Sequence, residues 1–399
     1  MIVLGSTGSV GTQTLDVIAH LNALHERGLS TLSFRVVGLS AGSNAEALAN
    51  QCARFGVREV ALCRAEGPIH GARTHIGPGA AEALVRSVDC DLVVASMVGI
   101  AGLPATMAAI SLGRDVALAN KETLVAAGSI VIPEAIRRGV RVLPLDSEHA
   151  ALWLALAGFL PPSQCPPVAL PEMVSRVVLT ASGGPFRTTP VEEMRRAGPE
   201  LALRHPTWSM GAKVTVDSAS LMNKALEVIE AHHLFGAPAD RITVSVHPQS
   251  MVHALVELAD GSVIAQIASP DMRLPIQQAL THPLRLPSLV PPVSWDATHR
   301  LLLEPPDRAK FGALDLATRV ITTGASAGAV LNAANEIAVD AFLAGRIPFG
   351  RITPLVADAL DRIPTRAISS IDDVLGADEE ARRFARDQLA SPSPTLTHG

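Results

Sequence analysis

Two hydrophobic patterns alternate along the first part of the chain, up to about residue 146. Short apolar runs rich in β-branched residues are separated by amphipathic stretches with helical spacing, such as residues 12–27 and 44–55. Repeated alternation of strand and helix is typical of a parallel sheet with helices on both faces, and such sheets bind ligands at the carboxyl ends of their strands. The expected strands are Ile2–Gly5, Phe34–Leu39, Glu59–Cys63, Asp91–Ser96, Asp115–Ala119 and Arg141–Leu145.

The pattern changes after Asp146. Four strand patterns are now interspersed with helical patterns at Ala219–His233 and Pro270–Thr281, and a turn at Asp260-Gly261 joins the last two strands. This mixture predicts an α+β domain over residues 147–284, after a first domain over residues 1–146. The expected strands of the second domain are Val177–Ala181, Arg241–His247, Met251–Leu258 and Ser262–Ala268.

The remainder of the chain predicts a helical domain. A proline-rich stretch without periodicity indicates a linker at residues 285–311, residues 312–390 have helical spacing, and residues 391–399 form a polar tail. The expected helices are Ala313–Thr323, Gly328–Ala344, Ile352–Arg362 and Ser370–Gln388.

Composition narrows the class of protein. The 399 residues are 48% hydrophobic and 18% charged, with mean hydropathy +0.30, as in a globular protein with a large core. The apolar run at residues 150–160 is shorter than the roughly 20 residues that cross a bilayer, and the chain opens on a strand pattern without a charged leader, so we expect a cytoplasmic protein. A net charge of −5, only 3% aromatic residues and no basic stripe argue against nucleic-acid binding. The four cysteines are scattered without a C-x-x-C pair, which favours reduced thiols over a zinc site or disulfides.

A glycine loop follows the first expected strand. Gly5, Gly8 and Gly11 are spaced G-x-x-G-x-x-G between a strand and a helix, where glycines permit a tight turn and the helix N-terminus receives a pyrophosphate. At the end of the second strand, residues 39–44 contain no acid that would bind a ribose 2′-hydroxyl, which favours NADP over NAD. The same loop contains no Arg or Lys, so the preference rests on the missing acid alone.

Asp146 and Glu148 follow the last strand of the first domain. Two apart in an extended strand end, their carboxylates point the same way, repel each other and gain from a shared cation. All-oxygen ligands favour Mg²⁺ or Mn²⁺ over zinc. A pair of this kind alone is more commonly a solvated loop or a helix cap.

A third carboxylate changes that balance. Residues 214–227 are expected to lead from a strand into a helix, with Asn223, Lys224 and Glu227 on one helical face. Lys224 and Glu227 could form an ordinary surface ion pair. The stretch is nevertheless unusually polar for a helix that also carries apolar residues, and Glu227 would complete a metal site.

Two further segments suggest a ligand. Ser182-Gly183-Gly184 ends a strand with a turn whose backbone amides could hold an anion, although a plain turn has the same composition. Residues 205–211 have neither strand nor helix period, and this loop with Trp208 and Met210 is either a lid over a ligand or a segment packed on the core. His253 and the pair at residues 232–233 are interpreted as structural.

Eight motifs occur in one order over nearly the whole chain. They are Gly5–Gly11 (GSTGSVG), Ala119–Thr123 (ANKET), Leu145–Ala150 (LDSEHA), Ser182–Phe186 (SGGPF), His205–Gly211 (HPTWSMG), Asp217–Glu227 (DSASLMNKALE), His247–Val252 (HPQSMV) and Ser269–Leu274 (SPDMRL). Together these motifs resemble the 1-deoxy-D-xylulose 5-phosphate reductoisomerase family. The resemblance implies a Rossmann-like NADPH domain, an α+β catalytic domain that forms a homodimer, and a C-terminal four-helix bundle.

The resemblance also implies an activity, a rearrangement of 1-deoxy-D-xylulose 5-phosphate and its NADPH-dependent reduction to 2-C-methyl-D-erythritol 4-phosphate in non-mevalonate isoprenoid biosynthesis. The sequence is compatible with a retro-aldol route and with a direct ketol shift. The implied metal ligands, for Mg²⁺ or Mn²⁺, are Asp146, Glu148 and Glu227, and these three are the implied catalytic residues with Lys121 and His205. The implied substrate contacts are Lys121, Ser147, Glu148, Ser182, His205, Trp208, Ser218, Asn223, Lys224 and Glu227. Of these, the resemblance places Ser182, Ser218, Asn223 and Lys224 around the phosphate. The implied NADPH contacts are Thr7, Gly8, Ser9, Val10, Gly42, Ser43, Asn44, Asn120, Glu122, Gly211 and Met272.

Two positions depart from the family pattern. Members often carry Lys or Arg where Ser43 stands, facing the 2′-phosphate, and serine supplies a hydrogen bond without charge. Thr207, where Asn is common, is a smaller change. Rival readings remain: another NAD(P) oxidoreductase, such as an aspartate-semialdehyde or homoserine dehydrogenase, or a dinucleotide-sensing regulator. An aspartate-semialdehyde dehydrogenase needs a nucleophilic cysteine in a polar turn, and a homoserine dehydrogenase needs no carboxylate cluster. A dinucleotide-sensing regulator would gain nothing from Mg²⁺.

Overall fold

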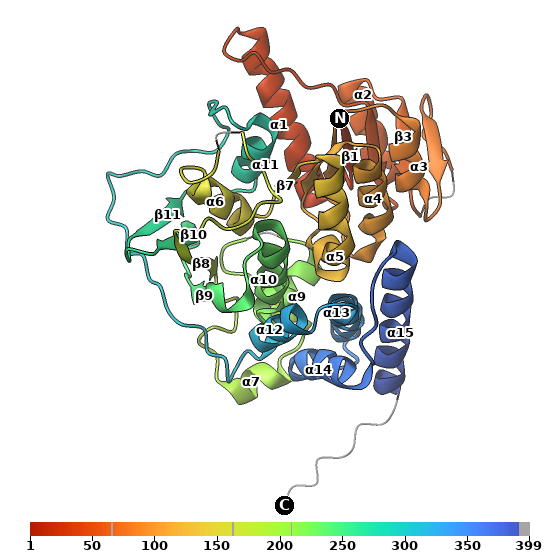
Figure 1. The fold of residues 1–399 in the computed structure, drawn as a ribbon. Coiled ribbons are helices and arrows are strands. Elements are labelled where there is room, and N and C mark those ends of the chain that lie inside the picture. Colours follow the sequence, from red (N-terminus) through yellow and green to blue (C-terminus); the bar gives the residue numbers. More distant parts are fainter. Residues whose placement is uncertain (65–66, 162, 209, 391–399) are drawn as a thin grey trace, which may run out of the picture.

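A seven-stranded parallel sheet forms the N-terminal part of the molecule (Figure 1). The computed structural model describes residues 1–64, 67–161, 163–208 and 210–390. The strand order is β4-β3-β2-β1-β5-β6-β7, and the inner strands are buried, as expected for a sheet covered on both faces. The strands are β1 (Ile2–Leu4), β2 (Gly38–Ala41), β3 (Glu59–Leu62), β4 (Arg73–Ile76), β5 (Leu92–Ala95), β6 (Asp115–Leu118) and β7 (Val142–Pro144).

Two strands of this sheet differ from the sequence prediction. The second strand was expected at Phe34–Leu39 but lies at Gly38–Ala41, where it pairs with β1 and β3. Its position is therefore set by the ladder and not by the β-propensity of the residues before it. The edge strand β4 was missed because its Arg-Thr-His-Ile sequence is too polar to give an apolar run. The helices around the sheet are α1 (Ser9–Glu26), α2 (Ala45–Phe55), α3 (Ala80–Ser87), α4 (Leu103–Ser111) and α5 (Lys121–Arg138), with the short η1 (Ile100–Gly102).

A second, four-stranded sheet follows, in the order β11-β10-β8-β9. β8 pairs parallel with β9 and antiparallel with β10, so this sheet is mixed, as the α+β prediction allowed. Residues 214–217 were expected to end a strand, but they are helical and belong to α9 (Ala212–Ala219). The strands are β8 (Val174–Ala181), β9 (Ile242–Val246), β10 (Val252–Leu258) and β11 (Val263–Ile267). The helices are α6 (Ser147–Leu156), α7 (Val191–Arg196), α8 (Pro199–Ala202), α9 (Ala212–Ala219), α10 (Met222–Phe235) and α11 (Arg273–Thr281), with η2 (Ala239–Arg241).

The C-terminal part is helical, as expected. Residues 285–311 connect it to the second sheet, and within this segment Glu304 forms an isolated antiparallel β-bridge with Val246. α13 is the buried central helix and packs against α14, α15, α12 and α5. Gly328 permits the α5 contact, because a Cβ there would lie 1.9 Å from the Val125 carbonyl oxygen. The helices are α12 (Ala313–Thr323), α13 (Ala327–Leu343), α14 (Ile352–Arg362) and α15 (Ile371–Ala390), with η3 (Phe349–Arg351). The tail at 391–399 lies outside the described residues.

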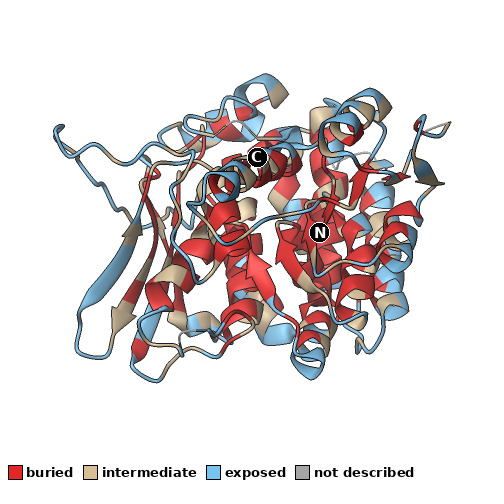
Figure 2. Ribbon diagram, turned by 90° about the horizontal axis from the view of Figure 1, so that it is seen from above, coloured by how far each residue is buried: buried red, intermediate tan, exposed pale blue. Residues whose placement is uncertain are grey.

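The parts meet around α10. This helix packs against α5 of the first sheet, β9 of the second, and α12 of the C-terminal part, and it lies near the centre of Figure 1. Figure 2 shows that the buried residues are concentrated in this interior and in the strands, with exposed residues on the outside. None of the described helices is both long and apolar enough to cross a membrane.

Candidate active site

The carboxyl ends of β6 and β7 bring two helix N-termini next to α10. Lys121 opens α5 directly after β6, and Asp146 is the N-cap of α6 after β7, with Glu148 in the first turn. Glu227 projects from the middle of α10 and is almost fully buried. The convergence agrees with the expectation that a parallel sheet builds its site at the carboxyl ends of its strands.

Asp146, Glu148 and Glu227 come together as the sequence predicted. Each offers one carboxylate oxygen, and these oxygens all lie within 4.8 Å of one another. Burial of Glu148 and the neighbouring Glu227 carboxylate raise the pKa of Glu148 above its ordinary value. A cluster of carboxylates that repel one another in a desolvated place is compensated by positive charge.

Two lysines supply part of that charge. The Lys121 ammonium lies 2.9 Å from Glu227 Oε1 and also pairs with Asp146. Lys224 Nζ lies 2.6 Å from Glu148 Oε1 and also pairs with Glu227. Burial raises the pKa of Asp146, but Lys121, His149 and Lys224 together outweigh it and hold that pKa well below its usual range. With three carboxylates and two ammonium groups, the donor set is hard, oxygen-rich and net negative, and it fits a divalent cation such as Mg²⁺ or Mn²⁺.

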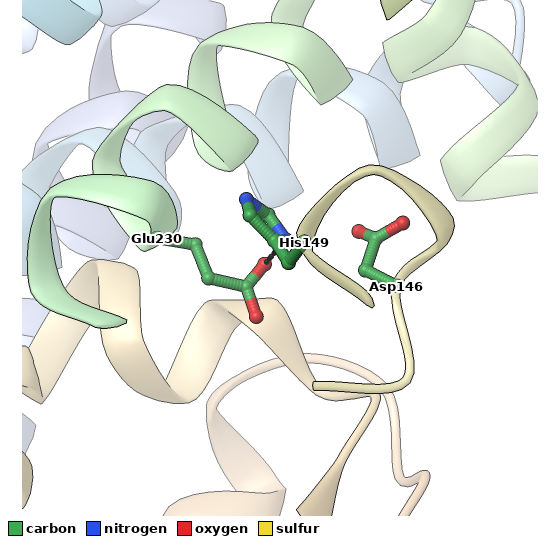
Figure 3. Close-up of side chains that lie close together, drawn as sticks. All are labelled: Asp146, His149 and Glu230. Atoms are coloured by element: carbon green, nitrogen blue, oxygen red, sulfur yellow. Dashed lines mark ion pairs between the residues drawn. The ribbon is translucent and has the colours of Figure 1, made fainter. Parts of the chain in front are cut away.

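A second polar pair lies behind the cluster and was missed from the sequence. His149 Nδ1 is 3.2 Å from Glu230 Oε2, and both side chains are fully buried (Figure 3). His149 Nε2 is 2.8 Å from the Glu227 backbone oxygen, so both ring nitrogens face acceptors. Burial would lower the pKa of His149, but Glu230 raises it to about 9. The available signal was the spacing of Glu230, one helical turn after Glu227 on the same face.

The Ser-Gly-Gly turn and the loop at residues 205–211 face each other. His205 Nε2 lies 3.0 Å from Ser182 Oγ and 3.1 Å from Ser218 Oγ, so these three predicted contacts do meet. Gly184, at φ 64°, permits the approach, because a Cβ there would lie 2.8 Å from the Ser218 carbonyl oxygen. A cavity of about 410 Å³ lies beside this group and is lined in part by Ser182, Arg187 and Arg204.

Asn223 and Lys224 were expected beside Ser182 and Ser218, but their hydrogen bonds and ion pairs are with the carboxylate cluster. Lys121 Nζ donates to Asn223 Oδ1 at 2.9 Å, and Asn223 Nδ2 donates to Glu227 Oε1. Ser147 Oγ likewise donates to its neighbour Glu148. These polar side chains therefore belong to the carboxylate half of the predicted site.

The loop at residues 205–211 is irregular, as expected, with Ser209 outside the described residues. Within the loop, the Trp208 amide donates to His205 Nδ1 at 2.8 Å, while His205 Nε2 joins the loop to the two serines. The Trp208 ring lies edge-on to His253, with 6.4 Å between ring centroids. His253, interpreted as structural from the sequence, is thus a neighbour of the loop, and burial lowers its pKa to about 4.

The glycine loop begins a second group of predicted contacts, at the carboxyl ends of β1 and β2. Gly5 has φ 73°, and a Cβ on Gly11 would lie 2.3 Å from the Gly5 carbonyl oxygen, so the tight turn requires glycine. The Ser40 hydroxyl accepts from the Gly5 amide at 3.0 Å and fixes the loop to β2. Thr7, Gly8, Ser9 and Val10 at the start of α1 are at least partly exposed, as a binding loop requires.

The neighbouring loop after β2 is exposed at Gly42, Ser43 and Asn44. Asn44 caps α2, its side chain accepting from the Ala47 amide at 3.0 Å. The backbone amide of Arg64, just after β3, donates to the Gly42 carbonyl at 2.8 Å. Sequence reasoning missed Arg64 as a neighbour of this loop because Arg64 follows a different strand.

The remaining predicted cofactor contacts lie on other elements. Asn120 and Glu122 lie at the carboxyl end of β6, where Asn120 Nδ2 donates to Glu122 Oε2 at 2.8 Å. Gly211 is the N-cap of α9, and Met272 is the N-cap of α11 and is half-buried. Among the described residues, no hydrogen bond joins Gly211 or Met272 to the glycine loop.

Fold and site together define a dinucleotide-binding protein of the Rossmann type, with a largely buried carboxylate cluster at the same carboxyl edge of the sheet as its nucleotide loops. Comparison with known sequences narrows this class. Residues 1–128 match the family model described as 1-deoxy-D-xylulose 5-phosphate reductoisomerase, and residues 142–235 and 267–384 match two models of its C-terminal domains. The chain belongs to the 1-deoxy-D-xylulose 5-phosphate reductoisomerase family.

Individual relatives agree over the whole length. The reductoisomerase of Chlorobium phaeovibrioides is 46% identical, with 98% of this chain and 99% of the relative covered, and that of Symbiobacterium thermophilum is 47% identical, with 97% of each covered. The solved reductoisomerase of Zymomonas mobilis in complex with NADPH has a TM-score of 0.85 at 37% identity, covering 98% of this chain and 99% of that one. A solved reductoisomerase in complex with NADPH, fosmidomycin and magnesium has a TM-score of 0.86 at 33% identity, covering 97% of each chain.

The His149–Glu230 pair predicts a pH-dependent stability. A histidine whose pKa is raised from 6.5 to about 9 stabilises the fold fully below pH 6.5, and that contribution is lost as the pH rises through about 9. We expect the wild type, with chelator present, to lose about 2–3 kcal/mol more than His149→Gln between pH 6.5 and 9.5 in urea unfolding. His25→Gln, an exposed histidine, serves as control and should follow the wild type. Parallel curves for wild type and His149→Gln would contradict the prediction.

Proposed function

We propose that this protein converts 1-deoxy-D-xylulose 5-phosphate to 2-C-methyl-D-erythritol 4-phosphate, by a rearrangement that needs a divalent metal and a reduction by NADPH, in non-mevalonate isoprenoid biosynthesis. Membership of the reductoisomerase family supports the reaction. The observation that carries it is the convergence of three carboxylate oxygens within 4.8 Å of one another, at the same carboxyl edge of the sheet as the nucleotide loops. A regulator that only senses a dinucleotide has no use for this cluster.

Asp146, Glu148 and Glu227 are the proposed ligands of Mg²⁺ or Mn²⁺, and with Lys121 and His205 they form the proposed catalytic set. The cation would supply Lewis acidity, polarising the substrate ketone and a neighbouring hydroxyl. Lys121 and Asn223, in contact with the cluster, orient substrate oxygens there.

The phosphate end is assigned to the group around His205. His205 Nε2 lies within 3.1 Å of both the Ser182 and the Ser218 hydroxyl, at a glycine turn suited to an anion. Lys224 supplies positive charge on the neighbouring helix, and phosphate held here anchors the substrate away from its reacting carbons. Trp208 would cover the bound substrate and exclude water. The full proposed set of substrate contacts is Lys121, Ser147, Glu148, Ser182, His205, Trp208, Ser218, Asn223, Lys224 and Glu227.

NADPH is assigned to the carboxyl edge of the first sheet. The loop at residues 5–11 and the N-terminus of α1 would receive the pyrophosphate, and the cofactor supplies the hydride while the chain positions it. We propose domains at residues 1–146, 147–284 and 312–390, so that the nicotinamide lies between the first two. The proposed NADPH contacts are Thr7, Gly8, Ser9, Val10, Gly42, Ser43, Asn44, Asn120, Glu122, Gly211 and Met272.

Glu227→Gln tests the metal site and the reaction together. We expect the wild type to consume NADPH with the xylulose phosphate only when Mg²⁺ or Mn²⁺ is added. The variant should bind NADPH within about twofold of wild type but lose turnover at least about 100-fold, since several kcal/mol of transition-state stabilisation depend on the cation. Glu257→Gln, on β10, serves as a control with the same change in chemistry. Full activity of Glu227→Gln in excess Mg²⁺ would remove Glu227 from the metal site.

The exposed loop after β2 tests the 2′-phosphate assignment. Ser43→Arg adds a charge-assisted contact and should tighten NADPH relative to NADH about tenfold, whereas Arg64→Ser should change the ratio in the opposite direction. Fluorescence titration of both cofactors measures the ratio. Thr31→Arg adds the same charge at an exposed position away from the loop and should leave the ratio unchanged. An unchanged ratio in Ser43→Arg would show that this loop does not read the 2′-phosphate.

We propose a cytoplasmic location, which suits the four free cysteines. We also propose that the protein is a homodimer joined at β11. β11 is the outer strand of its sheet, with Val263 54% and Ile267 37% exposed, and it borders no further strand among the described residues. A free apolar strand edge can pair with the same edge of a second copy across a two-fold axis. Sedimentation should give about twice 41.7 kDa, and Val263→Lys should lower it. A wild-type mass of one chain would exclude the dimer.

A further inference from the structure

Lysine is scarce in this chain, with only Lys121, Lys213, Lys224 and Lys310, because almost all surface cations are arginine. Lys121 and Lys224 contact the carboxylate cluster. Lys310 donates to backbone carbonyls after the Ser-Gly-Gly turn, including that of Phe186 at 2.6 Å. Lys213 has no role in the site assigned above, yet it too is largely buried.

Lys213 lies in the first turn of α9 and binds two acids. Its Nζ is 2.7 Å from Glu122 Oε1 and 3.0 Å from Asp217 Oδ2, and the three side chains are 15%, 6% and 1% exposed. Burial lowers the pKa of Lys213, but the two carboxylates outweigh it and raise that pKa, so the ammonium stays charged. An ion pair this well desolvated responds strongly to the loss of one partner.

The two acids belong to different parts of the molecule. Glu122 stands at the carboxyl end of β6 and also accepts from Asn120 Nδ2. Asp217, on α9 itself, accepts from Asn335 Nδ2 of α13 at 2.8 Å. One ammonium therefore holds α9 both to the edge of the first sheet and, through Asp217, to the C-terminal helices.

α9 carries the other side of the proposed active site. It begins at Gly211, where the loop at residues 205–211 ends, and it contains Ser218, which contacts His205. A shift of α9 would move the loop anchor and the phosphate group together, because both are fixed to one short helix.

We propose that Lys213 is a positioning residue that couples the NADPH site to the phosphate site and its loop. The inference rests on the proposed function, in which Glu122 faces NADPH and Ser218 faces phosphate. A bound cofactor that orders Glu122 would, through Lys213, fix α9 in the position that binds phosphate, and by reciprocity phosphate would favour cofactor. Buried ion pairs contribute little net stability compared with apolar packing, whereas they do specify one arrangement of the elements they join.

The test measures this coupling at equilibrium and does not depend on turnover. With Mg²⁺ present, the Kd of fosmidomycin, the ligand bound in one solved relative, is measured by calorimetry with and without NADPH. We expect the wild-type ratio of the two constants to lie within the roughly 5- to 150-fold range of coupled sites. Lys213→Met should bring the ratio to within about twofold of one, while fosmidomycin alone binds with a smaller change. Lys213→Arg should restore part of the ratio, since it keeps the charge but not the compact geometry.

Arg382→Met is the matched control. Arg382 is 19% exposed and also joins two acids, Glu336 and Asp378, but it lies on α15 and does not touch α9. A ratio unchanged in Lys213→Met, or lowered equally in Arg382→Met, would overturn the proposal. If Lys213→Met does not fold, as judged by circular dichroism, Glu122→Gln breaks the same link and must lower the ratio. Absence of NADPH and fosmidomycin binding in the wild type would instead contradict the proposed function.

Discussion

The structure depends on holding three carboxylates together out of water. Asp146, Glu148 and Glu227 repel one another, and their convergence persists because Lys121 and Lys224 lie between them. Each ammonium bridges two carboxylates, so the loss of either would leave buried negative charge without a partner. Because this negative charge must be compensated, the elements that carry the carboxylates and the lysines must meet at the cluster.

That requirement explains the arrangement of the parts. β6 and β7 end where α5 and α6 begin, which places Lys121 and Asp146 at one edge of the first sheet. α10 brings Glu227 from the chain of the second sheet, and its position is fixed by α5, β9 and α12. The close passage of α13 over α5 at Gly328 adds the C-terminal helices to the same junction. The site therefore belongs to no single part of the molecule.

The sequence predicted what local pattern controls. Apolar runs located five of the seven strands of the first sheet and placed a sixth a few residues too early, and the spacing of Asp146 and Glu148 indicated that their carboxylates lie together. It failed where tertiary pairing decides: β4 is too polar to be recognised, and residues 214–217 are helical although their β-branched residues suggest a strand. The His149–Glu230 pair lies between α6 and α10, and the Glu122–Lys213 pair between α5 and α9, so no local pattern pairs the two partners. Glu227 was found from the polar face of its helix, which was out of place among apolar residues, and from the family resemblance.

Charge balance explains why lysines and carboxylates are mixed in one cluster. Three carboxylates and two ammonium groups sum to −3 + 2 = −1, and a divalent cation would change that sum to +1. A site with this sum attracts a phosphorylated, oxygen-rich substrate, whereas the same carboxylates without lysines would repel it. The His149–Glu230 pair adds no net charge, because imidazolium and carboxylate cancel, yet it fixes the Glu227 backbone through its bond to the carbonyl oxygen. The neutral His149–Glu230 pair and the charged carboxylate cluster therefore have different tasks, although they are adjacent, because Asp146 offers an oxygen within 4.8 Å of both groups.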